Sequence, residues 1–481
     1  MGCIQSNPTS VVSPGDFLVG NIPSSLLRLV LSHNLSRFSN PLLLYHVPTS
    51  KLYTSSNGFS DFFKKISCIS SRFRAIFIDA LEDWSTSQKV VHAFNDVFKG
   101  GITGIPFVTC LNLTETFAGH NYRELFLRNL TGFKAPIDAI IMSSVLDSQL
   151  KEPSTLFPSI NATFIKYIEI CNAPNGIDCA DLLVYENLES CEFVYAELRN
   201  IAELKKLKRF TRMVLPVCRF NHSEFSSLIN LQHLDFTKAS VPDVIPFASL
   251  LSLKYLDLHA SWEINDISLL KDLVELEYLN IKDCSVSDIS VLSQFSKLRD
   301  LTIYRTQVRD LSPISGLIGL SVLDAFASKV DDVSPLLGLI YLRSLDLGHT
   351  LVTDFRGLAA LTRLEKLELR GTAVEDISFV SNLRKLSQLG LASTKIVNLS
   401  PLSNIVSLKH LDLSDTQVVD VSPLANLINL EFLALTNVPI SDISSLASLK
   451  ALVRLDLTGT SVDEAKRQWH LTQPNIEQLF L

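Results

Sequence analysis

The stretch from residue 413 to residue 427 reads LSDTQVVDVSPLANL and places a threonine, two aspartates and a Ser-Pro pair among apolar residues. Two interpretations fit this stretch. Thr416 or Ser422 could be a nucleophile beside Asp415 and Asp420, or the polar residues could shape the backbone around a buried core. A single copy does not separate these two possibilities, so the rest of the chain decides.

The stretch recurs along the chain with a 22-residue spacing. Leucines occur at positions 298, 320, 342, 364, 386, 408, 430 and 452, and the series continues upstream at 276, 253 and 231. The shared pattern is L-x-x-L-x-L-x-x-T-x-V-x-D-[IV]-S-P-L-x-x-L. An internal period of about 20 to 29 residues is typical of solenoids, in which each repeat stacks on the next. The pattern is therefore predicted to be structural.

Within one unit, the spacing of apolar residues predicts a strand, a turn and a short helix. Leu411 and Leu413 alternate with polar residues, which indicates a strand with one buried face. Val418 is predicted to be buried in the turn. Ser422 is predicted to be an N-cap, with Pro423 at the first helical position, where its fixed φ is suitable. A short helix or 3₁₀ turn then returns the chain.

Two polar columns repeat with the leucines. The aspartate column contains Asp288, Asp310, Asp332, Asp354, Asp376, Asp420 and Asp442. Calcium binding by this column is disfavoured, because stacked carboxylates about 4.8 Å apart repel one another. Asn398 in the same column favours a hydrogen bond in the turn instead. The threonine column is interrupted by Cys284, Ser328 and Val438, so it cannot have one catalytic role, and we predict hydrogen bonds in the bend.

These motifs resemble the leucine-rich repeat family, specifically the 22-residue class represented by a phosphatase-1 regulator and by bacterial internalins. The resemblance is strict from about residue 231 to residue 462. It implies an α/β solenoid, a curved right-handed coil with a parallel sheet on its concave side and short helices or 3₁₀ turns on its convex side. It also implies that partners bind to the concave side.

Less regular segments surround the strict repeats. FIKYIEI (164–170), LESCEFV (188–194) and LKRFTRMV (207–214) resemble degenerate units at unequal intervals, and IEQLFL at the end resembles a last strand. We therefore predict degenerate repeats over 161–230, and regular repeats with a C-terminal cap over 231–481. Residues 13–160 have no constant period and are predicted to be a capping domain or eroded repeats.

A second resemblance suggests an alternative function. IPSSLLRLVLSHNL from Ile22 and ISCISSRFRAIF from Ile66 resemble the two ends of an F-box, the pair of adaptor-binding helices in ubiquitin-ligase receptors. The interval between the two segments is longer than in that motif. A substrate-recognition subunit of a ubiquitin ligase is therefore the alternative to a simple interaction scaffold.

Composition excludes several classes of function. The chain has 481 residues, of which 47% are hydrophobic and 19% charged, and a formal net charge of −7. Its short basic run at 205–209 is too small to follow a nucleic-acid backbone, so nucleic acid is not an expected partner. Apolar runs are shorter than the roughly 18 residues of a membrane-spanning helix. No basic n-region precedes Arg28, so we expect no secretory signal and a cytosolic location.

Catalytic, metal and cofactor motifs are missing from the sequence. It contains no phosphate-binding loop, no H-E-x-x-H, no G-x-S-x-G and no kinase signature. The eight cysteines form no C-x-x-C pair, and the seven beyond Cys3 are expected to be buried core residues rather than metal ligands or disulfides. We therefore expect a binding protein that is not an enzyme and has no cofactor.

Side chains between the buried leucines are expected to project from the concave face and to bind a protein partner as a monomer. We expect a cluster of aromatic residues, which are enriched in interface hot spots, beside acidic residues that favour a basic segment. Alternatively, the aromatics are isolated surface residues and the acidic column maintains solubility. The candidate partner-binding residues are Tyr255, Asp257, Tyr278, Asp300, Tyr304, Asp324, Phe326 and Asp346.

The first six residues, MGCIQS, match the M-G-x-x-x-[ST] pattern for N-myristoylation. They also resemble the Met-Gly-Cys start of G-protein α subunits, which implies myristoylation of Gly2 and palmitoylation of Cys3. One myristoyl chain binds membranes only marginally, so a second signal at Cys3 is needed. We predict a flexible acylated arm over residues 1–12 that tethers the protein to the cytosolic face of a membrane. The match is accidental if the chain is bacterial or if its natural start lies elsewhere.

Overall fold

The computed structural model describes residues 165–239, 241–462, 476 and 478–480, together with four short strands nearer the N-terminus. These strands are β1 (Leu44–His46), β2 (Ala75–Phe77), β3 (Cys110–Leu113) and β4 (Ala139–Ser143), and they form the parallel pairs β1–β2 and β3–β4. The chain divides into two compact units, residues 1–143 with 153–165 and residues 144–152 with 166–481. The second unit contains the repeats.

The predicted acylated arm and the predicted F-box fall mainly outside the described residues. Gly2, Cys3 and the F-box-like segment from Ile22 all lie outside them. The F-box-like segment from Ile66 is described only at its end, where residues 75–77 form strand β2 rather than the helix that the resemblance implies. The organisation of residues 13–160 stays a prediction.

The second unit repeats one strand and one 3₁₀ helix. Its strands are β5 (Tyr167–Asp178), β6 (Ser190–Arg199), β7 (Arg212–Val214), β8 (Arg219–Phe220), β9 (His233–Asp235), β10 (Tyr255–Asp257), β11 (Tyr278–Asn280), β12 (Asp300–Thr302), β13 (Val322–Asp324), β14 (Ser344–Asp346), β15 (Lys366–Glu368), β16 (Gln388–Gly390), β17 (His410–Asp412), β18 (Phe432–Ala434), β19 (Arg454–Asp456) and β20 (Gln478–Phe480). Its 3₁₀ helices are η5 (Cys179–Val184), η6 (Ile201–Lys206), η7 (His222–Ser227), η8 (Ile245–Phe247), η9 (Ser268–Asp272), η10 (Ser290–Gln294), η11 (Ser312–Ile314), η12 (Ser334–Leu336), η13 (Arg356–Ala360), η14 (Ser378–Asn382), η15 (Ser400–Leu402), η16 (Ser422–Asn426) and η17 (Ser444–Ser448).

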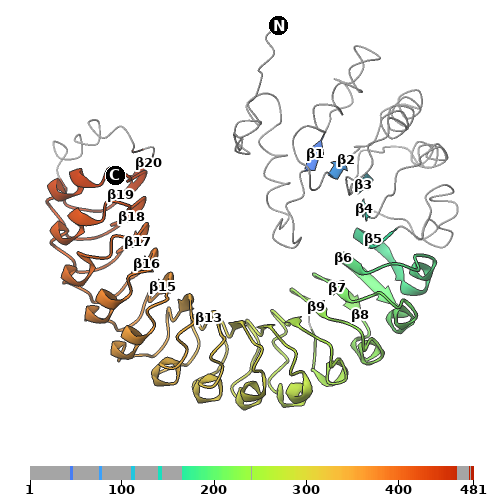
Figure 1. Cartoon of the computed structure of the whole chain (residues 1–481). Coiled ribbons are helices and arrows are strands. Elements are labelled where there is room, and N and C mark those ends of the chain that lie inside the picture. The colour runs from blue at the N-terminus through green and yellow to red at the C-terminus, as the bar shows by residue number, and fades with distance from the viewer. Residues whose placement is uncertain are drawn as a thin grey trace, which may run out of the picture. The chain divides into compact units, whose positions relative to one another are not determined.

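The repeat strands form one parallel sheet along the inner edge of a curved coil, and the 3₁₀ helices line its outer edge (Figure 1). Each strand from β9 to β20 pairs in register with the next, so that Leu256 lies opposite Leu279 and Leu279 opposite Leu301. The predicted fold, a curved solenoid with a parallel concave sheet and 3₁₀ turns, is confirmed.

The degenerate units upstream belong to the same sheet. Tyr167 pairs with Ser190, Ser190 with Arg212 and Arg212 with His233, so these partners follow one another at nearly equal steps along the chain. The predicted unequal intervals are therefore wrong, because they compared the starts of the segments instead of equivalent strand positions. The strand register shows that these units keep nearly the regular period.

The core is built mainly from the repeated leucines. Leu411, Leu413, Val418 and Leu424 are fully buried, as are their equivalents in the neighbouring repeats. The side chains described for Cys179, Cys191, Cys218 and Cys284 are free thiols within this core. In the described ranges, none of the helices is long and apolar enough to cross a lipid bilayer.

The aspartate column closes the turn before each 3₁₀ helix. Asp420 Oδ1 accepts a hydrogen bond from the Ser422 amide at 2.8 Å, and the Ser422 hydroxyl donates to Asp420 Oδ2 at 2.9 Å. Asn398 Oδ1 accepts from the Ser400 amide at 2.9 Å in the same way. The predicted turn hydrogen bond is confirmed. The prediction of Ser422 as N-cap is wrong, because η16 begins at Ser422 and the capping acceptor is Asp420, two residues earlier.

We predict that Asp420→Ala lowers the free energy of unfolding measurably, because it removes the acceptor that caps the 3₁₀ helix. Asp420→Asn should change it much less, because Asn398 makes the equivalent bond in its own repeat. Chemical denaturation of the two variants measures the difference. Equal destabilisation would assign the effect to the charge of Asp420 and not to its hydrogen bond.

The threonine column is satisfied by backbone carbonyls. Thr416 is 4% exposed, and its hydroxyl donates to the Leu413 carbonyl at 2.6 Å. Thr306, Thr350, Thr372, Thr394 and Thr460 make the equivalent bond, and Ser328 makes it to Ala325. The predicted role in the bend is confirmed. Thr416 is thus part of the scaffold.

Candidate functional site

The concave sheet carries columns of side chains at right angles to its strands. In each strand from β9 to β19 the middle leucine is buried, and the first and third residues lie on the concave face of the sheet. We call the line of first residues the first column and the line of third residues the third column. Because the strands pair in register, Tyr255, Tyr278 and Asp300 follow one another in the first column. The third column runs through Asp257 and Asn280 and continues toward the C-terminus.

The first column contains a stack of three rings, which we call the tyrosine stack (His233, Tyr255 and Tyr278). The ring centres of His233 and Tyr255 lie 3.8 Å apart at 12°, and those of Tyr255 and Tyr278 lie 4.0 Å apart at 6°. The strand spacing of about 4.8 Å allows this face-to-face packing. Each inner ring face is therefore covered by the next ring, and Tyr278 is the last ring on the side of β12.

A second stack lies beyond the ends of the next two strands. Tyr304 and Phe326 stack at 4.8 Å and 14°, and His349 contacts Phe326 edge-on at 5.1 Å. Lys282 Nζ lies 4.1 Å from the centre of the Tyr304 ring. We call these four residues the Tyr304 stack. A cation at one end and a histidine at the other cover its ends.

The structure brings the predicted aromatic residues together in two groups instead of one. Tyr255 and Tyr278 are the first residues of β10 and β11, whereas Tyr304 and Phe326 lie two residues after the ends of β12 and β13. The two pairs therefore occupy different columns. The predicted single cluster of consecutive rings is wrong in this respect.

The predicted carboxylates line the sheet between and beside the stacks. Asp257 accepts a hydrogen bond from Asn280 Nδ2 at 2.9 Å, but burial, together with the charge of Asp235, raises its pKa to about 6. Burial likewise raises the pKa of Asp346 to about 6, although the Gly348 amide donates to Asp346 at 2.9 Å. The pKa of Asp324 is also raised by burial.

Asp300 has the fewest stabilising contacts of these acids. Burial, and then the nearby charge of Asp324, raises the pKa of Asp300 to about 6. Among the described residues, no donor forms a hydrogen bond or an ion pair with the Asp300 carboxylate. A carboxylate in this position has a strong electrostatic preference for an added cation.

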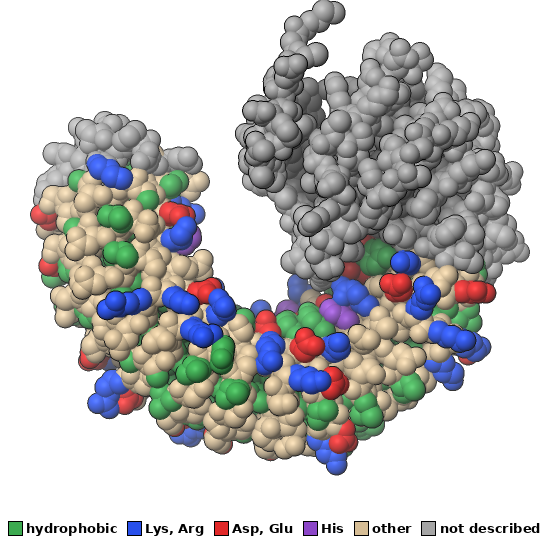
Figure 2. Space-filling view, viewed as in Figure 1, with side chains coloured by type: hydrophobic (Ala, Val, Ile, Leu, Met, Phe, Trp, Pro, Cys, Tyr) green, Lys and Arg blue, Asp and Glu red, His purple; other side chains and the backbone are tan. Residues whose placement is uncertain are grey.

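Several carboxylates outside the sheet form ion pairs with basic side chains. Lys297 Nζ lies 2.6 Å from Glu275, Lys409 Nζ lies 2.8 Å from Glu431, and Arg343 pairs with Glu365. Each pair joins equivalent positions of adjacent repeats. Figure 2 shows acidic and basic side chains interspersed on the face in view. Asp300 on the concave sheet has no such basic partner among the described residues.

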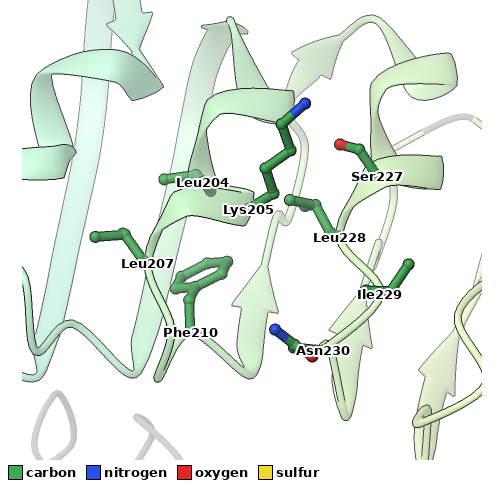
Figure 3. A pocket seen from close by; sticks show the side chains of 8 residues that line it. All are labelled: Leu204, Lys205, Leu207, Phe210, Ser227, Leu228, Ile229 and Asn230. Atoms are coloured by element: carbon green, nitrogen blue, oxygen red, sulfur yellow. The ribbon is translucent and has the colours of Figure 1, made fainter.

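A separate hollow lies between the repeats of η6 and η7 (Figure 3). It is lined by Leu204, Lys205, Leu207, Phe210, Ser227, Leu228, Ile229 and Asn230. The lining contains no carboxylate, histidine or cysteine, so it offers no pair of groups for general acid and base catalysis. The concave sheet is the stronger candidate for a functional surface.

Sequence reasoning missed three residues of this surface: His233, Lys282 and His349. His233 lies one repeat before Tyr255 and could have been found by extending the first column by one unit. Lys282 lies one repeat before Tyr304 in the same column and could have been found in the same way. His349 could not, because Gly348 occupies the position equivalent to Phe326 and the His349 ring reaches Phe326 from the next residue.

Comparison with known proteins finds one family match and several similar structures. A family model described as leucine-rich repeats in two copies matches residues 406–448. No curated protein matches the sequence. An internalin of Listeria monocytogenes is similar in structure, with a TM-score of 0.54 and 29% identity, and the match covers 57% of this chain and 82% of the internalin.

Two further solved structures share the fold. A leucine-rich repeat protein of Leptospira interrogans has a TM-score of 0.60 at 20% identity, and the match covers 74% of this chain and 91% of the Leptospira chain. A TDR receptor has a TM-score of 0.55 at 17% identity, and the match covers 75% of this chain and 66% of the receptor chain. Similarity at this level of identity concerns the architecture alone.

Proposed function

We propose that this leucine-rich repeat protein is a non-catalytic scaffold that binds a protein partner on its concave sheet. Solenoids of this kind present extended concave binding surfaces, and the fold is typical of protein–protein interaction. The observation that carries the proposal is the tyrosine stack beside the half-buried Asp300, which has no cationic partner in the described part of the chain. Ordered aromatic rings bind with little loss of side-chain entropy.

The partner that suits this surface is a basic protein segment, bound by a single copy of the chain. Asp257, Asp300 and Asp346 are partly desolvated and carry pKa values raised to about 6, so a positive partner lowers the electrostatic free energy of the sheet. A negative partner would raise it. Charge complementarity of this kind increases the association rate and selects against wrong partners.

We expect the triple variant Tyr255→Ala, Tyr278→Ala and Tyr304→Ala to lose affinity for the partner while keeping the fold. Each true anchor contributes about 2 kcal/mol or more, which corresponds to roughly 30-fold in affinity. The partner is first captured with the full chain, then purified and titrated against wild type and variant.

Trp262→Ala with Tyr341→Ala is the matched control for this test. Both side chains are exposed, and both lie outside the strands of the concave sheet. The control should bind as wild type does. If the triple variant and the control bound equally well, the concave sheet would have no part in recognition.

The proposed scaffold is tethered to the cytosolic face of a membrane by acylation of Gly2 and Cys3, which lie outside the described residues. We expect the full chain, expressed in a eukaryotic host, to sediment with membranes and to incorporate a myristate analogue. Cys3→Ser should leave weak, exchangeable association, and Gly2→Ala should release the protein. If the parent chain neither incorporated the myristate analogue nor sedimented with membranes, the scaffold would have no membrane tether.

A further inference from the structure

The tyrosine stack ends abruptly at Tyr278. The next residues in its column are Asp300, Val322 and Ser344, whose side chains are all shorter than a tyrosine ring. Tyr255 covers one face of the Tyr278 ring, and within the described ranges no lysine or arginine lies over the other. The face of the Tyr278 ring that points toward Asp300 is therefore covered neither by another ring of the stack nor by a described lysine or arginine.

One acid lies next to that ring, and a second lies one strand farther along the sheet. Asp300 pairs in register with Tyr278, and Asp324 belongs to the strand beyond it, in the third column. The two carboxylates raise each other's electrostatic energy, which is visible in the effect of the Asp324 charge on Asp300. We call Tyr278, Asp300 and Asp324 the acidic step. It combines an aromatic face with two adjacent negative charges.

The neighbouring Tyr304 stack indicates what such a surface accepts. Lys282 Nζ lies 4.1 Å from the Tyr304 ring centre, and its charge partly offsets the rise that burial causes in the pKa of Asp324. The chain itself therefore supplies a cation to one aromatic end and to one acid of the pair. Asp300 and the Tyr278 ring receive no equivalent cation from the described residues.

We propose that the partner inserts an arginine side chain at the acidic step, with its guanidinium stacked on Tyr278 and paired with Asp300. This inference rests on the proposed function and specifies the chemistry that the concave sheet recognises. A guanidinium is planar, stacks flat on aromatic faces and donates two parallel hydrogen bonds to a carboxylate, whereas the compact lysine ammonium contacts a ring as a point charge and cannot donate in parallel. A stacked and paired site therefore selects arginine over lysine.

Selection from a random peptide library on the immobilised full chain at pH 7.5 tests the proposal. We expect arginine-containing peptides to be enriched. A selected peptide should lose at least about tenfold in affinity when its arginine is replaced by lysine, since the substitution removes both stacking and bidentate pairing. Asp300→Asn should weaken the arginine peptide by a similar factor and abolish its advantage over the lysine peptide.

Three further variants separate recognition from folding. Tyr278→Phe keeps the ring and should bind as wild type does, while Tyr278→Ala should not. Asp456→Asn is the matched acidic control, because it lies in the third column at β19 and its turn bond from the Thr458 amide can be kept by asparagine. Asp300→Asn should melt at or above the wild-type temperature, because it removes the repulsion by Asp324.

The possible failures are distinguishable. Selected peptides without arginine, or equal binding of arginine and lysine peptides, overturn the acidic step as an arginine site. If those peptides still bind the double variant Tyr255→Ala with Tyr278→Ala more weakly than wild type, the proposal that the concave sheet binds the partner is retained. If their binding is unaffected by every concave variant, the proposed function falls as well.

Discussion

Leu369→Asp is expected to destroy the cooperative packing of the central repeats. Leu369 follows strand β15 and is fully buried, and its amide donates to the Gly390 carbonyl of the next repeat at 2.8 Å. Removing a buried leucine costs about 2 to 5 kcal/mol by itself, and a carboxylate without a partner in the core adds several more. In a solenoid each repeat is stabilised by its neighbours, so the loss should spread to both sides.

Leu351→Asp is the matched control, because Leu351 has the same side chain but is 56% exposed. It should change the free energy of unfolding by no more than about 0.5 kcal/mol. Far-UV circular dichroism and guanidinium denaturation of both variants measure the contrast. Similar stability of the two variants would contradict the assignment of position 369 to the core.

The repeat period was enough to predict the solenoid, because it recurs with little interruption and each unit is internally consistent. Leu411, Leu413 and Val418 could be assigned to the core from one repeat alone, and all three are buried. Asn398 in the aspartate column was enough to predict a turn hydrogen bond, since it retains the acceptor without the charge. Repetition turns a weak local pattern into a strong one.

Features that depend on a boundary of one or two residues were not predictable. The N-cap prediction failed because the 3₁₀ helix begins at Ser422 itself, which transfers the capping role to Asp420. The aromatic cluster divided because the equivalent of Tyr278 in the next repeat is Asp300, while Tyr304 lies past the end of β12 in a different column. Element ends are set by local geometry that the hydrophobic period does not encode.

The electrostatics of the candidate site also lay beyond the sequence. Asp420 and Asp300 are both aspartates of the repeat, yet hydrogen bonds from Ser422 lower the pKa of Asp420, whereas burial and Asp324 raise that of Asp300. Which of the two occurs depends on the depth of the side chain and on its neighbours in adjacent repeats. The sequence located the acids but could not assign their pKa values.

Raised pKa values in the concave sheet predict that partner binding weakens in acid. The pKa of Asp257, Asp300 and Asp346 is about 6 in each case, so their charge is present at pH 7.5 and mostly lost at pH 5. Charges facing them come from the sheet itself. Asp235 and Asp324 add negative charge, and Lys366 Nζ lies 3.7 Å from Glu368, beside Asp346. The pKa of His259 is lowered by burial, which delays its protonation.

Stability and binding should respond to pH in opposite directions, which gives the prediction a built-in control. Because the folded-state pKa of these acids lies above the usual value of about 3.9, the folded sheet binds more protons than the unfolded chain between roughly pH 4 and pH 6. Their contribution to stability therefore increases as pH falls through 6, so lost binding at pH 5 does not come from unfolding caused by these groups.

We expect affinity for a cationic partner to fall about tenfold or more between pH 7.5 and pH 5, measured by calorimetry at constant ionic strength. Asp300→Asn should bind more weakly at pH 7.5 and show a smaller pH dependence. Affinity that stays constant or rises toward pH 5 would show that the concave carboxylates do not contact the partner's charge.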